Sequence, residues 1–151
     1  MKKVIVVIPI YNKILKAHEE ISLKQCFKIL KKHPITFVCA PELDVQPYLD
    51  IAKKEGKQVN IETFESNYFK DIPGYNKLML SQKFYNRFLD YKHMLLYQTD
   101  AYVFRDELDD WCDLNYDYIG SPWLQDMEGW LYPPNPFPKE LVLLVLCQSQ
   151  S

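Results

Sequence analysis

The stretch LLYQTDAYVF, residues 95–104, places the carboxylate of Asp100 between two apolar runs, each as long as a short strand. An ionised Asp beside buried strands is unfavourable unless a partner or a bound ion compensates its charge. Three interpretations of Asp100 are open. It caps a turn, it pairs with a basic residue such as Lys77 or Arg105, or it holds a divalent cation that in turn holds a phosphorylated substrate.

The segments around this stretch alternate between strand-like and helix-like patterns. The continuous β-branched run at 4–10 is typical of a strand buried on both faces, and the apolar residues of 23–30 recur at the helical spacing i, i+3, i+4, i+7. This alternation predicts one α/β domain with a mostly parallel sheet and helices on both faces. The predicted strands cover 4–10, 35–39, 59–63, 93–100, 101–104 and 116–120, and the predicted helices lie around 23–30, 48–52, 75–91 and 108–112.

Polar residues follow three of the predicted strands, at 11–13, 41–44 and 98–100. In open α/β sheets, ligands bind beyond the carboxyl ends of the strands, so we expect a pocket at this edge. Tyr11 and Asn12 follow the first strand, where the aromatic ring could stack on a base; an ordinary polar loop is the alternative. Glu42 could accept a hydrogen bond from a base or ribose, or it is a solvated loop carboxylate.

The helix predicted over 75–91 carries Leu80, Phe84 and Phe88 at intervals of four residues. Asn76 and Lys77 are expected at its start, where the helix dipole and the Lys charge would favour phosphate; an exposed Lys with no ligand is the alternative. Asp117, in YDYIG, could approach an acceptor hydroxyl as a general base, or it makes a structural hydrogen bond.

Composition and charge exclude several function classes. The 18 Lys and Arg against 20 Asp and Glu give a net charge of −2, which does not favour a nucleic-acid partner. The four cysteines form no C-x-x-C pair and the three histidines are scattered, which disfavours a zinc site. The apolar runs at 4–10 and 141–147 are too short to span a membrane, and no cleavage site follows the first, so a cytoplasmic location is expected.

Three motifs in order carry a family resemblance: GYNKLMLSQKFYNRFLDY, LLYQTDAYVF and DYIGSPW. Together they resemble an uncharacterised family of GT-A-like glycosyltransferase domains with Tyr-Asn before a long helix, Gln-x-Asp-Ala at a strand end and Asp-Tyr-Ile-Gly-x-Pro-Trp afterwards. The opening strand at 4–10 is similar to that of nucleotide-sugar transferases. The resemblance covers roughly residues 1–125 and implies a GT-A-like fold, a nucleotide-sugar donor and transfer of the sugar to an acceptor such as a saccharide or a lipid-linked glycan.

The resemblance also implies roles for the residues at the strand end. Asp100 would bind Mn²⁺ or Mg²⁺, which would bridge to the diphosphate of the donor and stabilise the charge on the leaving group. Gln98 stands where the stricter pattern has a first Asp, so one negative ligand is missing and metal dependence is in question. Gln98 and Thr99 would lie beside the nucleotide, with Tyr11, Asn12, Glu42, Asn76 and Lys77 as further contacts.

The end of the chain departs from the family. The resemblance leads us to expect an Asn-Gly-Gly segment soon after Trp123, and none is present. We therefore expect an incomplete or truncated GT-A-like domain over 1–135 followed by an atypical tail over 136–151. A non-catalytic nucleotide- or sugar-binding module is the first alternative, and an α/β interaction domain is the second.

Overall fold

A parallel sheet organises the part of the chain that the computed structural model describes, residues 2–120 and 142–145. Within these residues six strands form one sheet in the order β3-β2-β1-β4-β6-β5, and each neighbouring pair is parallel. The strands are β1 (Lys2–Pro9), β2 (Ile35–Cys39), β3 (Val59–Thr63), β4 (Tyr91–Leu96), β5 (Tyr118–Ile119) and β6 (Val142–Val145). The helices are α1 (Ala17–Ile29), α2 (Gln46–Lys54), the 3₁₀ turn η1 (Ser66–Phe69), α3 (Ile72–Met79), α4 (Gln82–Tyr85) and α5 (Leu108–Asp113).

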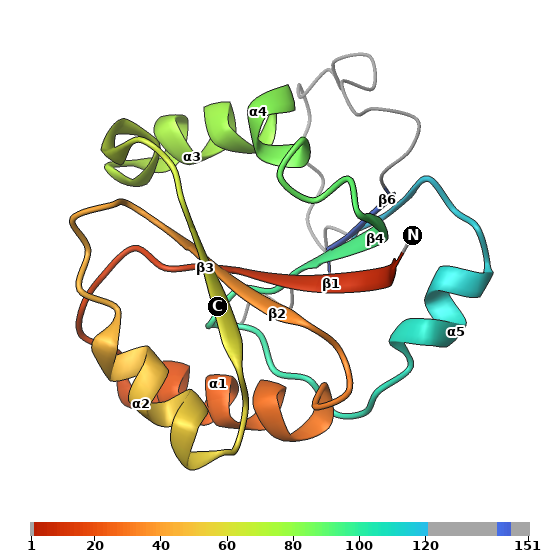
Figure 1. Cartoon of the computed structure of the whole chain (residues 1–151), viewed down its shortest axis with the longest axis horizontal. Coiled ribbons are helices and arrows are strands. Elements are labelled where there is room, and N and C mark those ends of the chain that lie inside the picture. The colour runs from red at the N-terminus through yellow and green to blue at the C-terminus, as the bar shows by residue number, and fades with distance from the viewer. Residues whose placement is uncertain (1, 121–141, 146–151) are drawn as a thin grey trace, which may run out of the picture.

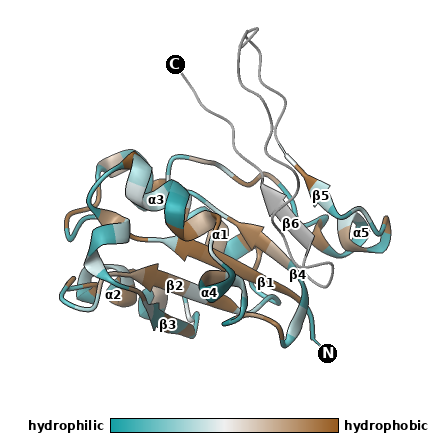
Figure 2. Cartoon of the chain, turned by 90° about the horizontal axis from the view of Figure 1, so that it is seen from above, coloured by the Kyte–Doolittle hydropathy of each residue, from teal (hydrophilic) through white to brown (hydrophobic). Residues whose placement is uncertain are grey.

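Helices cover both faces of the sheet, which confirms the predicted α/β class (Figure 1). Helices α1 and α2 pack on one face together with Leu108 and Cys112 of α5. Helices α3 and α4 pack on the other face. The central strands are mostly apolar, as Figure 2 shows, and Val6, Val7 and Ile8 of β1 are 0% exposed. A strand covered on both faces must be apolar at every position, which is why the run at 4–10 does not alternate.

The chain changes direction within the sheet between β1 and β4. From β1 it proceeds outward through β2 to β3, with α1 and α2 on one face. It then returns through α3 and α4 on the other face to β4, on the opposite side of β1. The strand that follows β1 in the chain lies on one side of this pair and the strand that follows β4 lies on the other, so the strand order reverses between β1 and β4. The carboxyl ends of such a pair form the topological switch point at which open α/β sheets bind ligands.

The single long helix predicted over 75–91 is wrong. Helix α3 ends at Met79 and a new helix begins at Gln82, because Ser81 interrupts the pattern. The Ser81 hydroxyl donates to the carbonyl of Leu78 at 2.8 Å and accepts from the amide of Phe84 at 3.3 Å, so it caps α4. Phe84 is buried as predicted, whereas Leu80 is 53% exposed.

The strand predicted at 101–104 is also wrong, and the strand predicted to run to Asp100 ends at Leu96. The amide of Ala101 donates to the carbonyl of Gln98 at 3.0 Å, which turns the chain away from the sheet. Beyond the turn, the carbonyl of Val103 accepts a hydrogen bond from a side chain and not from a neighbouring strand: Gln25 Nε2 of α1 donates to it at 3.1 Å. The alternation of buried and exposed residues in 101–104 therefore reflects packing on α1.

The other predicted elements agree with the structure to within a few residues. Gly56 follows α2 with a φ of 66°, the left-handed conformation that glycine adopts readily at the end of a helix. Of the predicted tail over 136–151, the structure describes residues 142–145, which form β6 between β4 and β5; the remainder lies outside the described residues. Trp123 also lies outside them. Within the described part of the chain, no helix is long and apolar enough to cross a bilayer.

Candidate functional site

Three elements meet at the carboxyl ends of β1 and β4. Tyr11 follows β1, Gln98 follows β4 and Tyr75 lies on α3. Gln98 Nε2 donates to Tyr75 Oη at 2.8 Å. The Tyr11 ring packs edge-on against Tyr75, with 5.8 Å between ring centroids, and against Phe69 at 6.1 Å. The switch point therefore carries a cluster of aromatic rings and one amide, which we call the Tyr11–Tyr75–Gln98 cluster.

The Tyr11 hydroxyl keeps its proton in this cluster. Burial raises the pKa of Tyr11 well above its ordinary value of 10.0, and the neighbouring Tyr75 and Asp100 side chains raise it further, against the opposing effect of a hydrogen bond with Gln98. The hydroxyl groups and the amide can therefore donate and accept hydrogen bonds without carrying a charge. Asp100 brings a formal negative charge to this neighbourhood.

Asp100 lies at the corner of the turn that leaves β4, and its side chain is exposed. Among the described residues the carboxylate makes no hydrogen bond and no ion pair. Arg105, one predicted partner, pairs with Glu107 at 2.8 Å instead. The turn-capping and ion-pair interpretations thus find no contact in this part of the chain, and the carboxylate faces solvent beside the cluster.

Thr99, next to Asp100, contacts the first turn of α1. Its hydroxyl lies 3.5 Å from Glu19 Oε1, and Glu19 Oε2 accepts from the amide of Lys16 at 2.7 Å. Glu19 therefore links the connection that follows β1 to the turn that follows β4. The sequence reasoning missed Glu19, although a Glu at the third position of a helix is a recognised capping signal.

Two buried hydroxyl groups also hold the turn that carries Asp100, and the sequence analysis did not identify them. Tyr97 Oη lies 3.0 Å from the carbonyl oxygen of Ala101, and Ser22 Oγ of α1 donates to the same oxygen. The two hydroxyl oxygens are 2.8 Å apart. A polar residue on the apolar stripe of a helix, such as Ser22, is the signal that could have drawn attention to this contact.

Asn12 lies beyond Tyr11 with its side chain exposed. Its main-chain carbonyl accepts a hydrogen bond from Tyr48 Oη of α2 at 2.7 Å, and burial raises the pKa of Tyr48 to about 12. Lys13, the next residue, forms an ion pair with Asp44 at 2.7 Å. The backbone of this loop is thus fixed, while the Asn12 side chain stays available beside the switch point.

The described contacts of Glu42 are with residues outside the Tyr11–Tyr75–Gln98 cluster. It follows β2, is exposed, and accepts from the Ser66 hydroxyl at 2.6 Å. This hydrogen bond lowers the pKa of Glu42 below its ordinary value. Glu42 lies at the predicted edge of the sheet and is bound to η1.

The prediction that Asn76 and Lys77 begin a helix is wrong. Helix α3 begins at Ile72, and Asp71 caps it by accepting from the amide of Gly74 at 2.7 Å. Pro73 in the first turn suits this start because its missing amide hydrogen is not needed there. Asn76 and Lys77 are exposed in the second half of α3, away from the amino-terminal dipole that would favour phosphate.

Asp117 is not brought to the same edge as Asp100. It is exposed and immediately precedes β5. Tyr118 of β5 is level with Leu143 of β6, which is level with Met94 in the middle of β4. Asp117 therefore lies beside the body of the sheet, whereas Asp100 lies beyond the carboxyl end of β4.

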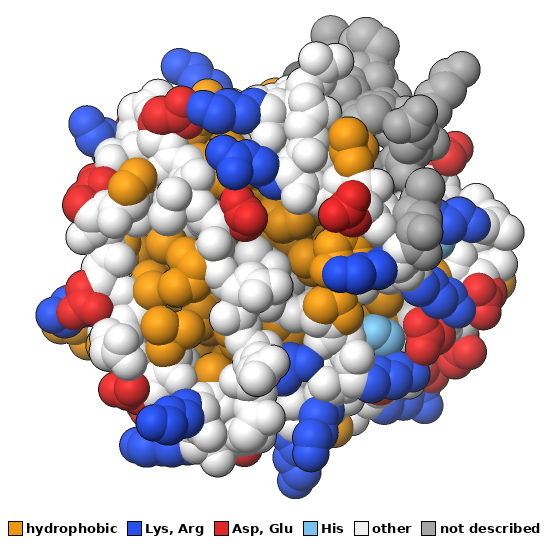
Figure 3. Space-filling model, viewed as in Figure 1, with side chains coloured by type: hydrophobic (Ala, Val, Ile, Leu, Met, Phe, Trp, Pro, Cys, Tyr) orange, Lys and Arg blue, Asp and Glu red, His pale blue; other side chains and the backbone are white. Residues whose placement is uncertain are grey.

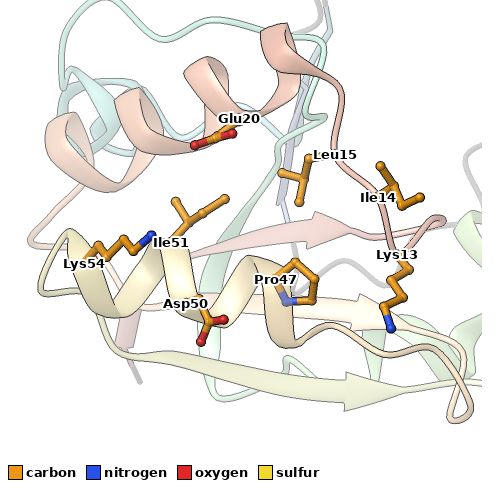
Figure 4. A pocket seen from close by; sticks show the side chains of 8 residues that line it. All are labelled: Lys13, Ile14, Leu15, Glu20, Pro47, Asp50, Ile51 and Lys54. Carbon is orange, nitrogen blue, oxygen red and sulfur yellow. The ribbon is translucent and has the colours of Figure 1, made fainter.

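A hollow of about 400 Å³ lies between α1, α2 and the loop that follows β1 (Figure 4). Its charged side chains are of both signs, and neither Asp100 nor the Tyr11–Tyr75–Gln98 cluster lines it. On the face in Figure 3, acidic and basic side chains are interspersed between apolar ones. The residues that line the hollow are Lys13, Ile14, Leu15, Glu20, Pro47, Asp50, Ile51 and Lys54.

The oxygen atoms near Asp100 could supply only some of the ligands that a hard cation needs. Within the described residues, no three His, Cys, Asp or Glu side chains gather as a metal site. One carboxylate with neutral amide and hydroxyl oxygens nearby fits a Mg²⁺ or Mn²⁺ ion that takes most of its ligands from water and from a diphosphate. It does not fit an ion that the protein alone encloses.

Comparison with known proteins places the chain in a family. No curated protein matches it. The family described as "Protein of unknown function (DUF5672)" matches residues 58–142, more than half of the chain, from β3 to the start of β6. The match includes Tyr75, the turn with Gln98 and Asp100, and Asp117. This chain belongs to the DUF5672 family of proteins of unknown function.

Proposed function

We propose that the switch point between β1 and β4 binds a nucleotide sugar, and that the chain is a GT-A-like glycosyltransferase domain. One observation carries this proposal: a solvent-facing carboxylate, Asp100, stands beside the aromatic and amide groups of the Tyr11–Tyr75–Gln98 cluster at the carboxyl ends of two adjacent parallel strands. This is where an open α/β sheet offers a ligand both a recess and converging polar groups.

Each group has a chemical role in such a site. The half-buried Tyr11 offers an aromatic surface to a base. Gln98 uses its Nε2 to hold Tyr75, which leaves its Oε1 to accept from a ribose hydroxyl. Asp100 and the Thr99 hydroxyl offer oxygen atoms to a divalent cation. When bound, the cation supplies positive charge against the donor diphosphate.

Sugar transfer breaks the bond between the anomeric carbon and the diphosphate oxygen, which leaves with the electron pair. The acceptor hydroxyl forms the new bond and gives its proton to a base. Asp117 is the base that the sequence predicts, although it lies beside the body of the sheet. An acceptor such as a saccharide or a lipid-linked glycan would have to reach from Asp100 toward β5, or another group takes the proton.

A non-catalytic binding module is the second candidate. One feature favours it: Gln98 stands where an acidic ligand is expected, and no further carboxylate joins Asp100 among the described contacts of the cluster. A neutral amide holds a cation less well than a carboxylate. Such a module would bind the nucleotide without transfer.

Calorimetric titration with UDP and GDP, with and without Mn²⁺, tests the proposal. We expect one nucleotide to bind more tightly with Mn²⁺, and Asp100→Ala to abolish the Mn²⁺ effect. Asp90→Ala is the matched control, because Asp90 is exposed at the opposite end of the same strand. Binding without sugar transfer or donor hydrolysis would identify the chain as a non-catalytic binding module. No binding in any titration would refute both the glycosyltransferase and the binding module, and an α/β interaction domain would remain as the interpretation.

We also propose a reducing, cytoplasmic location. Cys26, Cys39 and Cys112 are buried free thiols. Burial raises the pKa of Cys26 to about 12, so its thiol stays protonated and unreactive. Buried reduced cysteines are typical of proteins in reducing compartments.

A further inference from the structure

The carbonyl oxygen of Ala101 is held by two hydroxyl groups that belong to none of the residues proposed to touch a ligand. Ser22 Oγ donates to it, and Tyr97 Oη lies 3.0 Å from it. All three residues are buried, with Tyr97 only 2% exposed. Water cannot replace these hydrogen bonds at such a depth, so their loss would leave buried polar groups unpaired.

Tyr97 binds both ends of the turn that carries Asp100. Its amide donates to the carbonyl of Val7 in β1 at 2.9 Å, which fixes the beginning of the turn to the sheet. Its hydroxyl reaches Ala101, whose amide closes the turn onto the carbonyl of Gln98 at 3.0 Å. Thr99 and Asp100 therefore project from a short segment whose two ends are fixed through the same residue, one end by its main-chain amide and the other by its side-chain hydroxyl.

The part of the chain that the structure describes offers the Asp100 carboxylate no hydrogen bond or ion pair that would fix it. Its position is consequently set by the backbone of the turn, and the backbone is set by Tyr97, by Ser22 and by Gln25, which donates to the carbonyl of Val103 at 3.1 Å. A ligand group needs this precision, because small displacements weaken coordination and hydrogen bonding.

We propose that Ser22 and Tyr97 are positioning residues, whose paired hydroxyls hold the turn Gln98–Ala101 in one conformation and so place Asp100 for its ligand. The ligand part of this inference rests on the proposed function. The hydroxyls do not touch the ligand; they act through the carbonyl of Ala101.

Amide hydrogen exchange tests the effect on the turn. Tyr97→Phe and Ser22→Ala each remove one hydroxyl, and we expect the amide of Ala101, which donates to the carbonyl of Gln98, to exchange roughly tenfold faster while the amides of β1 keep their rates. Tyr85→Phe is the matched control, because the buried Tyr85 hydroxyl donates to the carbonyl of Met79 at 2.7 Å on the other face of the sheet. Folded variants whose turn exchanges at the wild-type rate would overturn the inference.

A double-mutant cycle tests the effect on the ligand, with Mn²⁺ and whichever of UDP or GDP binds the wild type. We expect Tyr97→Phe to weaken binding roughly two- to tenfold. In the Asp100→Ala background it should cause no further loss, since Tyr97 acts through Asp100. A loss that adds fully to that of Asp100→Ala would overturn the positioning role. If the wild type binds neither nucleotide, the proposed function fails, and the exchange rates alone decide whether the hydroxyl pair holds the turn.

Discussion

Gln98 Nε2 donates to Tyr75 Oη at 2.8 Å, which joins the residue that follows β4 to helix α3. The helix and the strand are separated in the sequence by α4, and Tyr75 and Gln98 meet because the chain returns through α3 and α4 to β4. Gln98 therefore fixes α3 to the end of β4, and it holds the α3 side of the candidate site in place.

The break between α3 and α4 leads to a prediction on stability. The sequence pattern treats Leu80 and Phe84 as one apolar ladder, whereas the structure exposes Leu80 and packs Phe84 against Phe64, Tyr85 and Phe88 at centroid distances of 5.6, 5.1 and 5.4 Å. Phe84→Ala should lower the free energy of unfolding by about 3–5 kcal/mol. Leu80→Ala should change it by less than about 0.5 kcal/mol. Urea denaturation measures both, and equal losses would support one continuous helix.

The amino-terminal cap of α3 gives a second prediction. Asp71 accepts from the amide of Gly74 at 2.7 Å, one of the four amides that a helix leaves unpaired. Asp71→Ala should lower the free energy of unfolding by about 1 kcal/mol, and Asp71→Asn should recover most of the loss. Asp90→Ala serves as the exposed control. A loss for Asp90→Ala as large as that for Asp71→Ala, in the same denaturation experiment, would count against the cap.

Much of the fold could be predicted because burial imposes simple patterns. The run at 4–10, buried on both faces, and the apolar stripe of 23–30 are direct consequences of packing, and both elements form as expected. The segment 101–104 shows the limit. Its alternation is real, but Ser22 and Gln25 of α1 bind its carbonyls, and no local pattern reveals contacts with residues 79 and 78 positions earlier.

In the candidate site, too, some positions could be predicted from the sequence and others could not. Topology alone places Tyr11 and Gln98 at one edge, since both directly follow adjacent parallel strands. The positions of Asn76 and Lys77 depended on where α3 begins, which Asp71 and Pro73 decide. The position of Asp117 depended on the register of β5, and this register follows from pairing with a strand far along the chain. Composition and periodicity determine neither the register of β5 nor the residues at which α3 begins.

The buried His93 leads to a third prediction, on pH. Its Nδ1 lies 3.2 Å from the carbonyl of Lys3, and among the described residues its buried Nε2 has no hydrogen-bond partner. Burial lowers the pKa of His93 below its ordinary value of 6.5, and the charges of Lys92 and Lys3 lower it further. As the pH falls below 6.5, the unfolded chain binds a proton that the folded chain refuses, so stability decreases.

We therefore expect the free energy of unfolding to fall between pH 7.5 and pH 5, and His93→Gln to reduce this fall because Gln does not titrate. Denaturation in urea at a series of pH values measures the difference. His18→Gln, at an exposed position of α1, is the control and should keep the wild-type slope. A variant at His93 with the full wild-type slope would show that this imidazole is not its source.

Adding a second carboxylate beside Asp100 gives a fourth prediction, which rests on the proposed cation site. Gln98→Glu keeps the length of the side chain, and a carboxylate at this position can still accept from the Tyr75 hydroxyl. It also adds a second negative charge two residues away from Asp100, so Mn²⁺ titrated alone should bind roughly tenfold more tightly than to the wild type. Gln58→Glu, at an exposed position before the amino end of β3, adds the same charge elsewhere and should have no effect. If the gain persists when Asp100→Ala is combined with Gln98→Glu, the ion binds without Asp100, and the carboxylate at the end of β4 has some other use.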